Sequence, residues 1–115
     1  MGAKHLILNF AKAAIALTES GAAFDVGGYQ DLIAEARCGV KTGGTSLTVV
    51  LEDSFDGGVT WNSWIAFTAW TASSGIEVKA PTRPPGPLVR YTATEVGGGS
   101  WANVTIRLAG NLIAG

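Results

Sequence analysis

The chain has 115 residues, of which 47% are hydrophobic and 15% charged, and its formal net charge is −1. At roughly 100–200 residues per domain, this length predicts one domain with its own core. The hydrophobic content excludes an intrinsically disordered chain. The balanced charge excludes the strongly cationic surface that neutralises nucleic-acid phosphates, so we expect no nucleic-acid partner. No apolar run approaches the roughly 18–20 residues of a membrane span, so we expect no membrane partner either.

Residues 1–20 are open to more than one interpretation. This segment is apolar, carries few charges, and includes Leu6, Ile7, Leu8 and Phe10. It forms either an extended N-terminal arm that reaches a neighbouring subunit or the first strand of the fold. A short helix over the alanine-rich stretch 10–17 is a third option, and we favour the arm. Residues 21–115 are expected to form a single β-sandwich domain.

From residue 32 onward, apolar and polar residues alternate with a period of two, which is typical of half-buried strands. The first predicted inward row is Leu32, Ala34, Ala36, Cys38 and Val40. The second is Leu47, Val49 and Leu51. A turn over residues 53–58 then leads to a third strand at 61–67, which is rich in aromatic and β-branched residues.

Three more strands are predicted in the second half of the chain. A short strand at 76–79 is expected to direct Ile76 and Val78 inward, and a proline-rich loop follows at 81–87. The strand at 88–96 has the inward row Val89, Tyr91 and Ala93. After a glycine turn at 97–100, the strand at 101–108 has the inward row Ala102, Val104, Ile106 and Leu108. The pattern predicts an all-β fold, an antiparallel sandwich or barrel of about 6–8 short strands with an extended N-terminal arm.

One motif stands out between the second and third strands. Residues 54–61 fit the pattern Ser-x-Asp-x-Gly-x-Thr-Trp, which resembles an Asp-box, a hairpin motif of sialidase propellers and of many unrelated β proteins. An Asp in such a turn accepts hydrogen bonds from backbone N–H groups, glycines permit positive φ, and Trp covers the hairpin. The motif therefore predicts a structural turn and not a catalytic centre. Its residues are Ser54, Asp56, Gly58, Thr60 and Trp61.

Other chemistry is less well supported by the residues. Cys38 is the only cysteine and His5 the only histidine, which favours a core position for the thiol over a catalytic or zinc-binding role. We therefore expect no enzyme activity, no metal and no cofactor. Two alternatives stay open. The acidic residues Glu52, Asp53 and Asp56 are either a solvated turn or a Ca²⁺ site, and Trp64 and Trp70 either pack inside or stack on a glycan.

The order of these segments resembles small β-sandwich virion proteins of tailed bacteriophages. The resemblance rests on residues 25–29 (Asp-Val-Gly-Gly-Tyr), 32–36 (Leu-Ile-Ala-Glu-Ala), 44–51, the turn at 54–61, and 88–91 (Leu-Val-Arg-Tyr). It covers about residues 25–108 and implies a capsid decoration (cement) protein. Such a protein is made in the host cytoplasm, lies on the capsid exterior, and binds the major capsid protein and copies of itself.

The resemblance also suggests where the contacts lie. The expected capsid or subunit contacts are Leu6, Ile7, Leu8, Phe10, Trp64, Trp70, Pro84 and Pro85. Alternatives within the virion are a tail, collar or fibre module that binds glycans, and a head–tail connector component. An ordinary cellular adhesion or enzyme-accessory domain is a further alternative.

Overall fold

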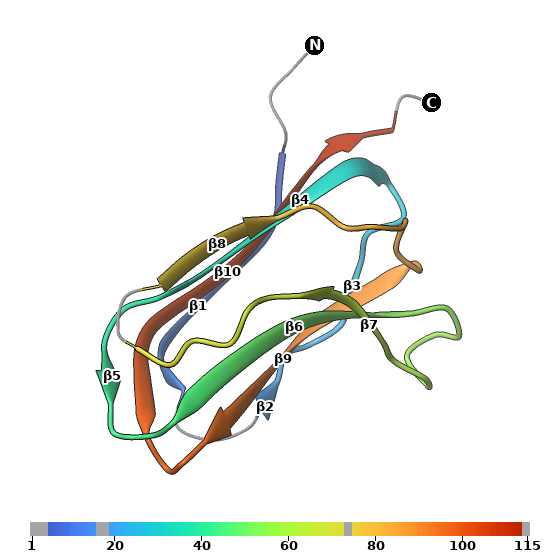
Figure 1. The fold of residues 1–115 in the computed structure, drawn as a ribbon. Coiled ribbons are helices and arrows are strands. Elements are labelled where there is room, and N and C mark those ends of the chain that lie inside the picture. Colours follow the sequence, from blue (N-terminus) through green and yellow to red (C-terminus); the bar gives the residue numbers. More distant parts are fainter. Residues whose placement is uncertain (1–4, 16–18, 73–74, 114–115) are drawn as a thin grey trace.

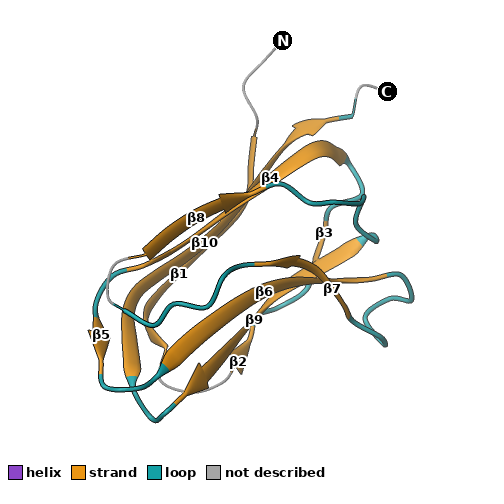
Figure 2. Cartoon of the chain, in the orientation of Figure 1, coloured by secondary structure: helices purple, strands orange, loops and turns teal. Residues whose placement is uncertain are grey.

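The structure is a computed structural model that describes the backbone of residues 5–15, 19–72 and 75–113, and the side chains of these ranges from Ile15 onward. Two antiparallel sheets face each other, as expected for a sandwich (Figure 1). Figure 2 shows strands joined by loops, and no part of the described chain forms a helix long and apolar enough to cross a membrane. The predicted all-β sandwich is therefore confirmed.

Within the described residues, each sheet has five strands. Sheet A has the order β1 (His5–Ile15), β10 (Ser100–Leu112), β4 (Tyr29–Cys38) and β8 (Gly75–Lys79), with β5 (Lys41–Thr42) also paired with β10. Sheet B has the order β2 (Glu19–Ser20), β9 (Leu88–Val96), β6 (Ser46–Ser54) and β7 (Asn62–Ala66), with β3 (Phe24–Asp25) also paired with β9. The strand number exceeds the expected 6–8 because β2, β3 and β5 are two-residue segments, too short to show alternation.

The core lies between the sheets and is formed by the predicted inward rows of the central strands. In β4 every second residue from Leu32 to Cys38 is buried, and in β6 the row Leu47, Val49 and Leu51 is buried. In β9 the row Val89, Tyr91 and Ala93 is also buried. Apolar side chains on one face of each sheet are thus removed from water, which is the dominant favourable contribution to folding.

Two residues predicted to face inward, Val40 and Ala102, do not lie in the core, and the strand β8 is a separate case. Val40 is exposed because it lies beyond the end of β4, where the alternation stops. Ala102 is only partly buried, and Trp101 takes the core position instead. The cause is a left-handed backbone at Asn103, with φ 54°, which lets Trp101 and Val104 both face inward although they are three residues apart.

In β8 the residues predicted to face the core face outward instead. Ile76 and Val78 are 59% and 58% exposed, whereas Glu77 and Lys79 occupy the register positions opposite the buried Ala36 and Ala34. From these positions the two charged side chains reach the main chain at the end of β7, in the other sheet, and just beyond it. Lys79 Nζ donates to the Ala66 carbonyl at 2.7 Å, and Glu77 Oε1 accepts from the backbone N–H of Thr68 at 2.8 Å. An inward-pointing pair of charges at a sheet edge is one way proteins close such an edge.

The N-terminal segment is described as a strand. The backbone of β1 pairs antiparallel with β10 of the same chain, from His5 opposite Gly110 to Ile15 opposite Trp101. This pairing matches the strand interpretation of the described part of residues 1–20. The predicted contact residues of this segment are Leu6, Ile7, Leu8 and Phe10. Their side chains are not among those that the structure describes.

Candidate functional site

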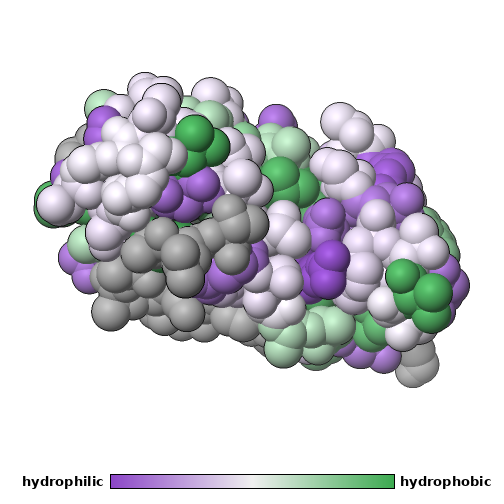
Figure 3. Space-filling model, turned by 90° about the horizontal axis from the view of Figure 1, so that it is seen from below, coloured by the Kyte–Doolittle hydropathy of each residue, from purple (hydrophilic) through white to green (hydrophobic). Residues whose placement is uncertain are grey.

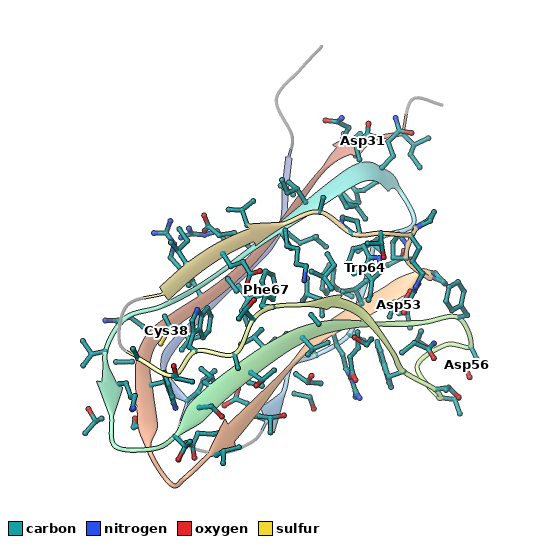
Figure 4. The ribbon with its side chains drawn as sticks, viewed as in Figure 1. Asp31, Cys38, Asp53, Asp56, Trp64 and Phe67 are labelled. Atoms are coloured by element: carbon teal, nitrogen blue, oxygen red, sulfur yellow. The ribbon has the colours of Figure 1, made fainter. Side chains whose placement is uncertain are left out.

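The two tryptophans expected to make contacts or stack on a glycan lie mainly inside the molecule. Trp64 is 6% exposed, and its indole N–H donates to the Arg83 carbonyl at 2.9 Å. Figure 4 shows Trp64 with Phe67 and Cys38 between the sheets. Trp70 is half-buried against the core, and its backbone is paired with Leu47. Trp64 is therefore corrected from a contact residue to a core residue, because β7 places it on the inner face of sheet B.

The proline-rich loop is fixed to the core by an ion pair between a buried carboxylate and a partly exposed guanidinium, which was not among the sequence-based predictions. Asp53, fully buried at the end of β6, accepts hydrogen bonds from Arg83 Nη1 at 2.6 Å and Nη2 at 2.8 Å. The backbone N–H of Gly86 donates to the same carboxylate at 2.7 Å. Arg83 also donates to the carbonyls of Ser63 and Pro84, so it connects β6, β7 and the loop. Of the two predicted proline contacts, Pro84 is exposed and Pro85 is half-buried.

This ion pair accounts for Asp53, one of the three acidic residues considered as a solvated turn or a Ca²⁺ site. Burial alone would raise the pKa of Asp53, but the hydrogen bonds from Arg83 and Gly86 outweigh it and hold the pKa below its usual range. The carboxylate is thus an anion with a cationic partner. No group of three or more His, Cys, Asp or Glu residues in the described part of the chain is arranged to hold a metal ion. The missed signal is in the sequence: Asp53 continues the inward row of Leu47, Val49 and Leu51.

The turn at 54–61 has the hydrogen bonds expected from its sequence. Asp56 Oδ1 accepts from the backbone N–H groups of Val59 at 3.2 Å and Thr60 at 2.8 Å, and from the Ser54 hydroxyl at 2.8 Å. The Ser54 hydroxyl in turn accepts from Gly58 N–H at 2.9 Å. The hydrogen bonds from Thr60 and Ser54 lower the pKa of Asp56 to about 2, so its carboxylate is charged at neutral pH.

Glycines and a tryptophan complete this turn. Gly57 and Gly58 have φ of 75° and 96°, a region that favours glycine. The Trp61 indole N–H donates to the Gly58 carbonyl at 3.0 Å. Arg90 lies 4.3 Å above the Trp61 ring and pairs with Glu52 at 2.9 Å. The turn is therefore held both internally and against sheet B.

Two large apolar side chains project from this rigid turn. Phe55 is 65% exposed and Val59 is 84% exposed. We call Phe55, Asp56 and Val59 the turn tip. Figure 4 shows Asp56 at the far end of the turn, and Figure 3 shows hydrophobic residues at the right-hand end of the molecule. Exposed apolar groups on a rigid element are typical of contact surfaces.

A second exposed apolar surface lies on the face of sheet A that is turned away from sheet B. Ile76 and Val78 of β8 lie there beside the outward residues of β4 and β10, over two shallow hollows of about 410 and 300 Å³. Glu35 lies between two arginines, 3.3 Å from Arg37 and 3.1 Å from Arg107. We call this surface the outer groove, and it consists of Ile33, Arg37, Ile76, Val78, Arg107 and Ala109.

Another hollow, of about 460 Å³, lies between the start of β4 and the proline-rich loop. Its lining includes Tyr29, Asp31 and Arg83, which are a suitable set for a polar ligand. However, Arg83 is already bonded to Asp53, and Asp31 accepts from the Asn111 amide at 3.2 Å. These groups therefore maintain the fold at this end of the sandwich.

The thiol of Cys38 is buried on the inner face of sheet A. Burial raises the pKa of this thiol, which disfavours the reactive thiolate. This is the core position that the sequence predicts for Cys38.

Comparison with known proteins gives a likeness in fold alone. No protein-family model matches the sequence, and no curated protein matches it. A chain of the Bacillus endospore appendages, which form a novel family of disulfide-linked pili, is similar in structure. The TM-score is 0.58 at 17% sequence identity, over 97% of this chain and 93% of that chain.

Proposed function

We propose that this chain is a non-catalytic structural subunit that assembles in many copies. The observation that carries the proposal is the pair of exposed apolar surfaces, the turn tip and the outer groove, on rigid parts of a well-packed sandwich. Apolar side chains on a preorganised frame lose little conformational freedom when a partner covers them. A subunit of a repeating assembly can also rely on avidity, so each contact needs only modest affinity.

The specific assembly we propose is a virion. In this role the chain is a capsid decoration protein that binds the major capsid protein and neighbouring copies on the capsid exterior. The resemblance of its strand order and turns to small virion proteins of tailed bacteriophages supports this role. A head–tail connector remains an alternative within the same particle. A glycan-binding tail or fibre module is a weaker alternative because the ring of Trp64 is buried.

A filament subunit is the second candidate, and the fold likeness to the endospore appendage chain favours it. The disulfide linkage of those pili is not expected for this chain. Linkage by disulfides needs accessible thiols, whereas the one cysteine of this sequence, Cys38, is buried. A filament of this chain would therefore be held by non-covalent contacts.

Immunogold electron microscopy of a lysate from cells that produce the protein tests these roles. The decoration role predicts gold label spread over capsid shells. Label confined to the neck or tail would transfer the protein to the connector or fibre role, and label along filaments would favour the appendage role. A matched lysate without the gene is the control. Label on none of these assemblies would contradict the structural role itself.

A further inference from the structure

We propose that the turn tip of one copy binds the outer groove of a second copy, so that the chains associate head to tail. This inference rests on the proposed structural role and names the contact by which copies associate. It joins two surfaces on which large apolar side chains are exposed: Phe55 and Val59 on one side, and Ile76 and Val78 on the other.

The turn tip has the properties of an inserting element. Its backbone is fixed by the hydrogen bonds that Asp56 accepts from Val59 and Thr60, and by the bond from Gly58 to the Ser54 hydroxyl. Phe55 and Val59 are thus presented in one arrangement before any partner arrives. Such preorganisation lowers the entropy cost of association.

The outer groove has the properties of a receptor for an apolar side chain. Its hollow of about 410 Å³ has Ile76 in its lining beside Arg37 and Asn103. Its hollow of about 300 Å³ is lined by Ile33, Val78 and Ala109 together with Glu35 and Arg107. Their position on strands β4, β8 and β10 makes this face as rigid as the sheet itself. Aromatic and aliphatic side chains seated in such hollows are typical centres of protein interfaces.

The charges of the two surfaces are complementary. The turn tip presents the exposed carboxylate of Asp56, which is ionised at neutral pH. On the outer groove, Arg37 and Arg107 flank the single carboxylate of Glu35, so these three residues together carry one positive charge. An acidic tip against a cationic groove favours the head-to-tail orientation over contacts between two tips or two grooves.

The arrangement in space makes the contact intermolecular. The turn tip belongs to the connection between β6 and β7, which projects beyond the end of sheet B (Figure 1). The outer groove lies on the face of sheet A that is turned away from sheet B. One chain therefore has a free groove when its tip is bound. A contact between two different surfaces of the same chain continues from copy to copy into a ring or an open array.

A mixing experiment with two variants tests this contact. The tip variant combines Phe55→Ser and Val59→Ser, and the groove variant combines Ile76→Glu and Val78→Glu. Light scattering after size-exclusion chromatography measures the mass of each variant alone and of an equal mixture. We expect the wild type to associate increasingly with concentration and each variant alone to associate at least about tenfold more weakly. The mixture should form a one-to-one pair, because the tip variant keeps its groove and the groove variant keeps its tip.

The control variant is Val40→Ser with Leu112→Ser, which removes two exposed apolar side chains outside both surfaces. It should associate like the wild type, and all variants should keep the wild-type circular dichroism spectrum. Three results would each overturn the tip–groove contact. Both variants could associate on their own as strongly as the wild type, the mixture could form no pair, or the wild type could stay monomeric. The proposed structural role would survive these results if the chain still labels assemblies in the microscope. The structural role would be contradicted together with the tip–groove contact only if the gold label is absent from all assemblies as well.

Discussion

Arg83 covers the buried carboxylate of Asp53 with two hydrogen bonds of 2.6 and 2.8 Å, and the two residues are thirty positions apart in the sequence. Their contact ties the proline-rich loop to the end of β6, beside the turn that carries the turn tip. The pair therefore determines how firmly this end of the sandwich is held. Removing either partner would leave the other without the interaction that compensates its desolvation.

Replacement of Arg83 by methionine should lower the free energy of unfolding by about 3 kcal/mol. Losing the partner of a buried charge costs about 3–5 kcal/mol, and the partly exposed position of Arg83 favours the lower end of this range. Urea denaturation measures the change. Arg37→Met is the matched control, because its exposed ion pair with Glu35 should cost less than about 1 kcal/mol. Equal effects of the two substitutions would contradict the structural role of the Arg83 pair.

The same substitution should change the dependence of stability on pH. In the wild type the pKa of Asp53 is lowered, so its stabilising contribution is present above its unfolded pKa of about 3.9 and is lost as pH falls through the lower folded value. In Arg83→Met, burial without a cation should raise this pKa, so protonation at low pH should stabilise the variant. The stability difference between the two proteins should therefore shrink from pH 7 to pH 4. A constant difference over this interval would contradict the assignment.

Replacement of Asp56 by alanine should loosen the turn tip without unfolding the sandwich. The backbone N–H groups of Val59 and Thr60 would lose their acceptor, so their hydrogen exchange measured by NMR should become faster. Asp56→Asn keeps an acceptor oxygen and should retain more of the protection. Core amides of β6 should be unaffected in both variants. Unchanged exchange at Val59 and Thr60 in the alanine variant would mean that Asp56 does not hold the turn.

The glycine turn between β9 and β10 offers a matched pair of substitutions. Gly97 and Gly98 both have positive φ, at 95° and 71°, so alanine at either position is strained by about 1–2 kcal/mol. A Cβ atom on Gly97 would also lie 2.6 Å from the Thr45 nitrogen, whereas one on Gly98 would meet nothing within 4 Å. Gly97→Ala should therefore lower the thermal midpoint more than Gly98→Ala. The reverse order would contradict the close approach of the two turns.

The long central strands could be predicted from the sequence, because their alternation fixes both the strand and its inward face. The row from Leu32 to Cys38 and the row from Leu47 to Leu51 are buried as expected. A strand as short as β8 does not fix its face in this way. The hydropathy of Ile76 and Val78 favours the core. Glu77 and Lys79 nevertheless take the inner positions, because main-chain groups near β7 donate and accept hydrogen bonds there.

The candidate site was harder to predict because exposure depends on contacts between distant segments. The residue pattern of the turn at 54–61 predicts its hydrogen bonds. It does not predict that the side chains of Phe55 and Val59 are exposed. Trp64 is an aromatic residue in a strand, and its burial depends on the loop that places the Arg83 carbonyl 2.9 Å from its indole nitrogen. Local sequence does not contain that information.

The most direct test of the proposed virion role is the copy number of this protein in purified virus particles. Quantitative mass spectrometry measures it against the major capsid subunit. A decoration protein predicts a copy number comparable to that of the capsid subunit, retained after the particles are washed. Complete absence of the protein from the particles would contradict the proposed virion role.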